Sequence, residues 1–326
     1  MRAAVIPRPG GPEVLEVRDV DAPSPGADDV LVRVRAAGLN RADILQRRGG
    51  YAPPAGAPAQ IPGLEFAGEV VEVGERVETL VPGDRVFGIT GGGAHAELIA
   101  VPAVTAARIP GALPWEHAGA IPEAFITAHD ALVTQAGLSG GDRVLIHAVG
   151  SGVGLAAVQV ARAVGAVPYG TSRTPAKIER AREYGLEGGA AIAEPADVVA
   201  HAADWAPDGF DVVLDLVGGV CTPASVSVLA VRGRLMLVGL VGGSTAAFDL
   251  RRILSRRIAI IGTVLRSRSV EEKAAATDAF ARDLAAGFAS NAVRAVIDSV
   301  FPLDAIADAH RRMESNATFG KVVIVP

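Results

Sequence analysis

Hydrophobic and polar positions follow two patterns, which divide the chain near residue 112. In residues 1–110, short apolar or alternating runs lie between turns rich in Pro, Gly and Asp. These runs cover residues 14–20, 30–36, 69–74, 81–88 and 96–101. Short strands at this spacing predict a small β-barrel or β-sandwich.

Beyond residue 112, apolar strands alternate with helices. Residues 114–136 are rich in good helix formers, and Pro114 suits a first helical turn. Further along the chain, helical segments such as 153–164 and 175–184 alternate with continuous apolar runs at 143–148, 167–171, 211–217, 234–238 and 257–261. This alternation indicates a parallel sheet covered by helices on both faces.

The last part of the chain returns to the first pattern. Residues 271–288 predict an amphipathic helix, and residues 298–301 and 321–325 predict short strands. We therefore expect an α/β protein in which a doubly wound parallel domain is inserted into a β-rich domain. The expected β-rich domain comprises residues 1–124 and 263–326, and the inserted domain comprises residues 125–262. A length of 326 residues is consistent with two domains.

Composition excludes several classes of protein. Half of the residues are hydrophobic and 21% are charged, which rules out a mainly disordered chain. The net charge of −5 argues against a nucleic-acid partner. Cys221 is the only cysteine, so the chain forms no internal disulfide and suits a reducing compartment. No signal-like apolar segment follows Met1, and we expect a soluble, cytoplasmic protein with no membrane partner.

A glycine-rich loop joins the strand at residues 143–148 to the helix that follows it. Its residues are Gly150, Ser151, Gly152, Val153 and Gly154. In this strand–turn–helix context, backbone N–H groups can approach a pyrophosphate at the positive end of the helix. The glycines alternate and do not match the G-x-G-x-x-G spacing, and close packing of the strand on the helix is the alternative explanation. We expect this loop to bind a dinucleotide.

The residues after the second strand of this domain indicate which dinucleotide binds. An acidic residue is expected there when a ribose 2′-hydroxyl is recognised, but residues 169–174 contain none. Ser172 and Arg173 lie at this strand end, and Lys177 lies on the next helix, where basic groups can contact a 2′-phosphate. A solvated helix face is the alternative for Lys177. The sequence thus predicts NADPH over NADH.

The sequence offers little for a metal or a nucleophile. Cys221 stands alone, and the six histidines show no zinc-ligand spacing, so we expect no metal. Residues 137–141 match the G-x-S-x-G pattern of a nucleophile elbow, but they precede a strand instead of following one. We interpret this segment as a turn. Asp215, at the end of an apolar strand, is likewise interpreted as a turn or cap residue.

Several motifs together resemble those of one family over nearly the whole length. They are Gly38–Asp43 with Gln46, Gly50 and Tyr51; Pro62–Glu65; Gly83–Val86; Ala120–Ala124; Thr127 and Ala128; His147–Gly154; Gly239–Gly243; Leu265–Arg268; and Phe319–Val322. With them the chain resembles zinc-free medium-chain dehydrogenases/reductases of the quinone oxidoreductase type, in particular the p53-inducible quinone oxidoreductase-like group. Ser151 stands where many relatives have Gly, a difference that this group shares.

The resemblance implies a fold and a set of partners. It implies a GroES-like catalytic domain, a Rossmann domain, NADPH as cofactor, a small quinone or enone as substrate, and a homodimer or homotetramer. Zinc-dependent relatives have a cysteine ligand at the position of Asn40 and a histidine ligand at that of Leu64, and both are replaced here. The resemblance therefore also implies hydride transfer without zinc.

The resemblance further implies roles for individual residues. Asn40, Tyr51 and Thr127 are candidates for the catalytic site, through an amide, a phenol and a hydroxyl near the nicotinamide. For Asn40 a helix cap is the alternative, and for Tyr51 the closure of a loop. Segments beside the nicotinamide or closing the cleft supply further candidates for cofactor binding: Gly239, Leu240, Val264, Leu265, Phe319 and Lys321.

We therefore expect an NADPH-dependent quinone oxidoreductase. In such a reaction the cofactor donates hydride, and a hydrogen-bond donor stabilises the oxyanion that develops on the acceptor. The spacing of Asn40 and Tyr51 also resembles that of NADPH-dependent 2-enoyl thioester reductases, in which the tyrosine assists protonation of an enolate. A non-catalytic NADPH-binding protein of the crystallin type is a third possibility.

Overall fold

The computed structural model describes residues 1–326, and the chain forms two compact units. Unit 1 comprises Met1–Ile126 and Leu265–Pro326, and unit 2 comprises Thr127–Val264. Unit 1 is therefore made of two segments that are far apart in the sequence. None of the helices combines the length and the hydrophobicity that a membrane-spanning helix requires.

Unit 1 is organised around a seven-stranded sheet. Its strand order is β14-β15-β3-β4-β5-β7, and β6 pairs with β3 outside this order. The bounds are β3 (Asp29–Leu39), β4 (Glu65–Val73), β5 (Arg85–Ile89), β6 (Leu98–Pro102), β7 (Ala106–Arg108), β14 (Ile297–Pro302) and β15 (Lys321–Val325). A separate pair consists of β1 (Arg2–Val5) and β2 (Glu16–Asp19). The predicted strands of the β-rich part are thus confirmed, although the sequence pattern did not identify β1 or β7.

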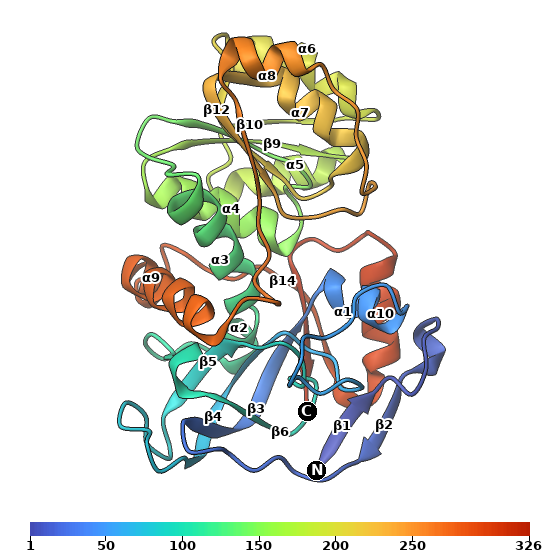
Figure 1. The fold of residues 1–326 in the computed structure, drawn as a ribbon, viewed down its shortest axis with the longest axis vertical. Coiled ribbons are helices and arrows are strands. Elements are labelled where there is room, and N and C mark those ends of the chain that lie inside the picture. Colours follow the sequence, from blue (N-terminus) through green and yellow to red (C-terminus); the bar gives the residue numbers. More distant parts are fainter. The chain divides into compact units, whose positions relative to one another are not determined.

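The C-terminal strand completes the sheet that the N-terminal residues begin. β15 pairs antiparallel with β3, with Val322 opposite Leu39 and Ile324 opposite Ala37, and parallel with β14. Figure 1 shows the red C-terminal elements running among the blue and cyan N-terminal ones. Alternation along β3 directs Val30, Val32 and Val34 into a buried core, where they pack with residues such as Phe66 and Val86.

Helices of different lengths cover this sheet. They are α1 (Arg41–Arg47), α2 (Trp115–Gly119), the start of α3 (Pro122–His129), α9 (Val270–Ala289) and α10 (Ile306–Glu314). The Ser269 side chain accepts a hydrogen bond from the Glu272 N–H and thereby caps α9. Phe288 on α9 packs edge to face on Phe125 with ring centroids 5.0 Å apart. Aromatic contacts of this kind anchor the second segment of unit 1 to the first.

The helical character predicted for residues 114–136 is confirmed, and the structure divides it among several elements. The structure has α2 and α3 there, followed by a π-helical segment at Asp130–Gln135. Pro122 lacks an N–H group, so it cannot continue the hydrogen bonding of α2, but it suits the first turn of α3. The break places Glu123 in the first turn of a new helix.

Unit 2 is a parallel sheet covered by helices. Its order is β10-β9-β8-β11-β12-β13, which is the 3-2-1-4-5-6 order of dinucleotide-binding sheets. The strands are β8 (Arg143–Ile146), β9 (Val167–Ser172), β10 (Gly188–Ala191), β11 (Phe210–Asp215), β12 (Leu229–Leu237) and β13 (Ala259–Gly262). The helices are α4 (Gly152–Ala163), α5 (Pro175–Ala181), α6 (Val198–Trp205), α7 (Thr222–Val228) and α8 (Leu250–Arg256). β8 and β11 are neighbours in the middle of this order, and successive strands are added outward from β8 on one side and from β11 on the other. In sheets of this kind a ligand site is expected beyond the carboxyl ends of these two strands.

Two buried histidines of unit 1, His95 and His310, each have a ring nitrogen without a hydrogen-bond partner. His310 on α10 is fully buried; its Nδ1 lies 3.0 Å from the Arg47 guanidinium and its Nε2 has no partner. Because the guanidinium can only donate, it occupies the Nδ1 lone pair that a proton would need. Burial, with positive charge at His95 and Arg47, lowers the pKa of His310 to about 2.

Unit 1 should therefore lose stability as the pH falls below the ordinary histidine pKa of about 6.5. Between that value and the folded pKa of about 2, the unfolded chain binds a proton at residue 310 that the folded chain does not. His310 alone should contribute a slope of about 1.4 kcal/mol per pH unit to the free energy of unfolding. We expect His310→Gln to remove this slope in urea unfolding followed by Trp115 fluorescence, with Trp205→Phe as background. His117→Gln, at an exposed histidine, should keep the slope, and an equal slope in all three proteins would contradict the prediction.

Candidate functional site

A buried ion pair holds one group of candidate residues together in unit 1. Lys321 Nζ, at the start of β15, lies 2.6 Å from Glu65 Oε1, at the start of β4. The ammonium group also donates to Asn40 Oδ1 at 2.5 Å and to the Leu39 carbonyl at 3.1 Å. Glu65 is fully buried and Lys321 nearly so. Each charge therefore depends on the other for compensation.

The amide of Asn40 is fully used within this network. Its Nδ2 donates to Glu65 Oε1 at 2.9 Å and to the Gly38 carbonyl at 3.3 Å, while its Oδ1 accepts from Lys321. Asn40 also precedes α1, where Asp43 Oδ2 accepts from the Asn40 N–H at 2.8 Å. The structure therefore gives Asn40 the alternative role at the start of a helix, and its amide is oriented by Lys321 and Glu65.

Glu65 links the ion pair to the first turn of α3. Its second oxygen, Oε2, accepts a hydrogen bond of 2.8 Å from the Glu123 N–H. A carboxylate at this place satisfies one of the free N–H groups of the helix and interacts favourably with its dipole. Gly38 leaves the space for Glu65, because a Cβ at Gly38 would lie 2.1 Å from Glu65 Oε1.

Tyr51 is held from the other side by an arginine that the sequence analysis did not single out. The Arg266 guanidinium lies 4.8 Å from the centroid of the Tyr51 ring and donates to the Tyr51 carbonyl at 3.3 Å. It also donates to the Gly91 carbonyl at 2.9 Å and to Gln46 Oε1. Burial raises the pKa of the Tyr51 phenol, which therefore stays protonated at neutral pH.

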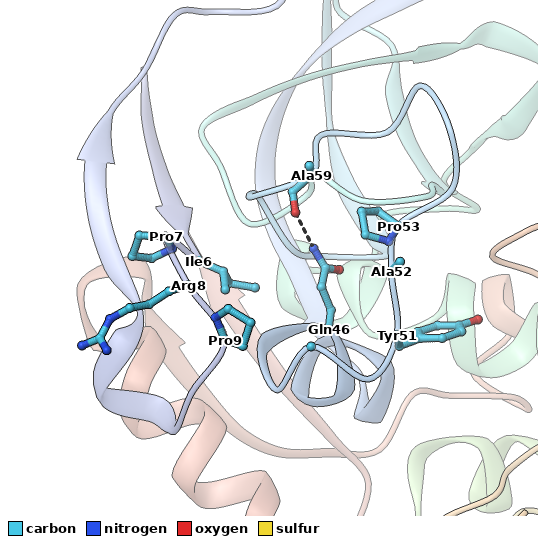
Figure 2. Close-up of a pocket in the computed structure, with 10 residues that line it drawn as sticks. Ile6, Pro7, Arg8, Pro9, Gln46, Tyr51, Ala52, Pro53 and Ala59 are labelled. Atoms are coloured by element: carbon cyan, nitrogen blue, oxygen red, sulfur yellow. Dashed lines mark hydrogen bonds between the residues drawn. The ribbon is translucent and has the colours of Figure 1, made fainter.

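A small pocket lies beside the loop that carries Tyr51. It has a volume of about 230 Å³ and is lined mainly by apolar residues, among them Ile6, Pro7, Pro9, Ala52 and Pro53. Figure 2 shows the Gln46 amide reaching to the Ala59 carbonyl, a hydrogen bond of 3.2 Å, while the Tyr51 ring points away from Pro7 and Pro9.

The predicted glycine loop lies in unit 2, between β8 and α4. Ser151 caps α4 by accepting a hydrogen bond of 3.1 Å from the Gly154 N–H. A Cβ at Gly154 would lie 2.6 Å from the Ala148 carbonyl oxygen, so the helix approaches the strand end too closely for any other residue. Ala148 itself adopts the left-handed conformation with φ of 51°. This geometry leaves the start of α4 as bare backbone, which suits a phosphate group.

The basic candidates flank this loop. The aliphatic part of Lys177 packs against Gly150, since a Cβ at Gly150 would lie 2.9 Å from Lys177 Cδ. Arg173 is exposed at the end of β9, and Ser172 Oγ accepts a hydrogen bond from the Thr174 N–H. The structure thus brings the glycine loop, Lys177 and the end of β9 together within unit 2.

The remaining predicted cofactor residues are dispersed. Gly239 and exposed Leu240 follow β12, and Val264 is exposed at the end of unit 2. Leu265 and Phe319 are buried in unit 1, where the Phe319 N–H donates to Asp298 Oδ1. Lys321, predicted to bind the cofactor, donates instead to Glu65, Asn40 and Leu39 within unit 1. Thr127, predicted to be catalytic, is buried on α3 and belongs to unit 2.

Two interpretations of polar residues as turns are confirmed. Asp215 Oδ1 accepts hydrogen bonds from the Val217 and Gly218 N–H groups, which closes the turn after β11. Asp142 Oδ2 accepts from the Ser139 N–H, so the segment that matches the nucleophile elbow is a turn before β8.

Glu65, Glu123 and Arg266 lie in motifs that carry the family resemblance, but no role was predicted for any of the three. The sequence feature that could have identified Glu65 and Glu123 as functional candidates is a charged residue at the start of an apolar strand or helix, as in Pro62–Glu65 and Ala120–Ala124. Which of these charges meet depends on the pairing of β15, β3 and β4, which no local pattern specifies.

Comparisons with known proteins agree with this architecture. A profile described as "Alcohol dehydrogenase GroES-like domain" matches residues 26–111, and one described as "Zinc-binding dehydrogenase" matches residues 152–282. A quinone oxidoreductase of Lama guanicoe is 34% identical over 337 residues, which cover 100% of this chain and 97% of that protein. The predicted fold class, a Rossmann sheet with a GroES-like β-rich domain, is confirmed.

Solved structures are similar over the whole length. A mycobacterial protein complexed with NADPH has a TM-score of 0.87 and 27% identity, with 100% of both chains covered. The CurK enoyl reductase has a TM-score of 0.86 and 27% identity, with 99% of this chain and 98% of that chain covered.

The description of one matching profile implies zinc, and the residues of this chain do not fit that metal. No group of three or more His, Cys, Asp or Glu side chains is arranged to hold a metal ion. Asn40 is bonded to the Lys321 ammonium, and Leu64 is a buried apolar residue. A positive charge is therefore already present beside Glu65.

Replacing Lys321 with Met should destabilise unit 1 by about 3–5 kcal/mol, because Glu65 would remain buried without a counter-ion. Adding Glu65→Gln should recover much of this loss, since the uncompensated charge is then gone. Urea unfolding in the Trp205→Phe background measures both changes. Lys273→Met, at a half-buried lysine of α9, serves as the control. A double variant no more stable than Lys321→Met would contradict the proposed dependence of each charge on the other.

Proposed function

Because the chain belongs to the quinone oxidoreductase group of the medium-chain dehydrogenase/reductase family, we propose that it transfers hydride from NADPH to a quinone or a related electron-poor acceptor. Oxidoreductase activity follows from the family. The choice of NADPH is carried by one observation: the glycine loop lies against Lys177, and no acidic side chain stands at the end of β9. We further propose that unit 1 supplies most of the catalytic residues and unit 2 most of the cofactor site, with boundaries near residues 124/125 and 262/263.

A nicotinamide cofactor, when bound, supplies the hydride. We propose that the backbone at Gly150–Gly154 holds its pyrophosphate at the start of α4, and that Arg173 and Lys177 contact a 2′-phosphate. The similar mycobacterial structure with NADPH supports this assignment. Further contacts are proposed for Ser172 and for the segments at Gly239, Leu240, Val264, Leu265 and Phe319. Lys321 is proposed to act only indirectly, through Glu65 and Asn40.

Quinone reduction requires little from the protein besides binding and a hydrogen-bond donor. The proposed donor is the Tyr51 phenol, which remains protonated and is braced by Arg266. Asn40, with both ends of its amide already bonded, is proposed to shape the site. Thr127 is proposed as a hydroxyl donor. No metal is needed in this scheme.

A second candidate is reduction of a 2-enoyl thioester. The similarity to the CurK enoyl reductase favours it, as does the spacing of Asn40 and Tyr51 in the sequence. In that reaction Tyr51 would help to protonate an enolate, which is a more demanding task than binding a hydroquinone oxygen.

We also propose a homodimer or homotetramer in the cytoplasm. β13 is the edge strand of the unit 2 sheet, and its backbone is open to pairing on one side. The neighbouring helix α8 exposes Leu250 and Leu254, which are 67% and 77% exposed and share one helix face. Both features suit contact with a second copy. The compartment is proposed because the chain has a single, buried cysteine.

Arg173→Asp should reverse the cofactor preference. The change replaces a donor to the 2′-phosphate with a negative charge, so kcat/KM for NADPH should fall by about 10- to 100-fold, while that for NADH should be little changed. Arg162→Asp, near the C-terminal end of α4, is the matched control and should keep the NADPH preference. Wild-type protein that prefers NADH would contradict the assignment.

Tyr51→Phe should separate the two candidate reactions. A panel of quinones, enones and enoyl-CoA thioesters, followed by NADPH oxidation in a stopped-flow instrument, gives kcat for each substrate class. A quinone reductase should lose only a few-fold in kcat, whereas an enoyl thioester reductase should lose about 100-fold or more because a proton donor is gone. NADPH binding without oxidation by any acceptor would instead indicate a non-catalytic binding protein.

A further inference from the structure

Glu123 is placed by the same interactions that organise the unit 1 site. It occupies the first turn of α3, and its backbone N–H is bonded to Glu65 Oε2 at 2.8 Å. Glu65 is in turn fixed by Lys321 and Asn40. The Glu123 side chain is mostly buried but keeps some exposed surface, and only burial and nearby charges, without a hydrogen bond, act on its carboxyl group. A carboxyl in a rigid position is thus left free to bond with a ligand.

The charges around this carboxyl favour its neutral form. The Glu123 carboxyl interacts electrostatically with six other charged or titratable groups: Glu65, Asp43, Lys321, Arg266, Tyr51 and Lys273. Lys321 is the cation that would stabilise a negative charge on Glu123 most, but it is already paired with Glu65. Burial, followed by the negative charge of Glu65, raises the pKa of Glu123 to about 8. At pH 7 most of these carboxyls then carry a proton.

We propose that Glu123 donates the proton that completes reduction of the acceptor, a role that rests on the proposed function of the site. Hydride adds two electrons and one hydrogen to the acceptor, which leaves a negative charge on an acceptor oxygen. The O–H bond of the Glu123 carboxyl breaks, and a new O–H bond forms on that oxygen. Glu123 remains as a carboxylate and recovers a proton from water, so each turnover consumes one hydride and one proton.

The other groups of the cluster are poorer donors. The Tyr51 phenol has a pKa above its ordinary value of 10, so it holds its proton more tightly than Glu123 does. Both carboxylate oxygens of Asp43 already accept hydrogen bonds, from the Asn40 and Gly63 N–H groups. The Lys321 ammonium is committed to three oxygen acceptors. Tyr51 is then the group that orients the acceptor oxygen, and Glu123 is the group that supplies the proton.

Infrared difference spectroscopy tests the protonation directly, without substrate. Spectra recorded between pH 6 and pH 10 should show the carbonyl band of a protonated carboxyl disappear with a midpoint near pH 8. Glu123→Gln should remove this band, whereas Glu78→Gln, at an exposed glutamate of unit 1, should keep it. A band that titrates unchanged in Glu123→Gln would overturn the inference.

Kinetics test the proton transfer. For wild type and Glu78→Gln, kcat for quinone reduction should fall at alkaline pH with an apparent pKa near 8. Glu123→Gln should reduce kcat on the order of 100-fold and abolish this alkaline limb, with NADPH affinity by fluorescence unchanged. If both kcat and its alkaline limb are unchanged in Glu123→Gln, the inference about Glu123 is overturned while the proposed function still stands. Wild-type protein that binds NADPH but reduces no quinone or enone would overturn the proposed function, and the inference with it.

Discussion

The buried pair of Glu65 and Lys321 is the interaction on which the rest of unit 1 depends. It joins the starts of β4 and β15, which flank β3 on either side, and through Glu65 Oε2 it also holds the start of α3. Two opposite charges removed from water are tolerated only when each meets the other with good geometry. The pair therefore specifies how the C-terminal strand enters the sheet, and it fixes the strand ends where the candidate residues lie.

The same pair determines which candidate groups are free to act. It occupies the amide of Asn40, which the resemblance had connected with the nicotinamide, and the ammonium of Lys321, which it had connected with closing the cleft. Tyr51, braced by Arg266, and Glu123, anchored by its backbone, are left with polar atoms that can face a ligand. The proposed division, between residues that hold the site together and residues that act on a ligand, thus rests on which hydrogen bonds are already satisfied.

Unit 2 depends on a different constraint, the close approach of backbone to backbone. The start of α4 lies against the end of β8 so tightly that only glycine fits at residue 154. This closeness presents the positive end of the helix directly at the carboxyl edge of the sheet. Lys177 extends along the loop with its aliphatic part on Gly150. The proposed site for an anionic group therefore depends on the absence of side chains as much as on the presence of a lysine.

The sequence by itself determined the local features of this protein. Runs of apolar residues identified most strands of both sheets, and the glycines after β8 identified the loop, because these properties depend on residues that are close in the chain. Short elements such as β10, whose residues are Gly188–Ala191, lack an apolar pattern and were missed. Only the tertiary structure decided that Lys321 meets Glu65, that Arg266 lies on Tyr51 and that Pro122 separates α2 from α3. These contacts join residues up to 256 positions apart, and such pairings arise from strand order and the burial of charge, which no local pattern encodes.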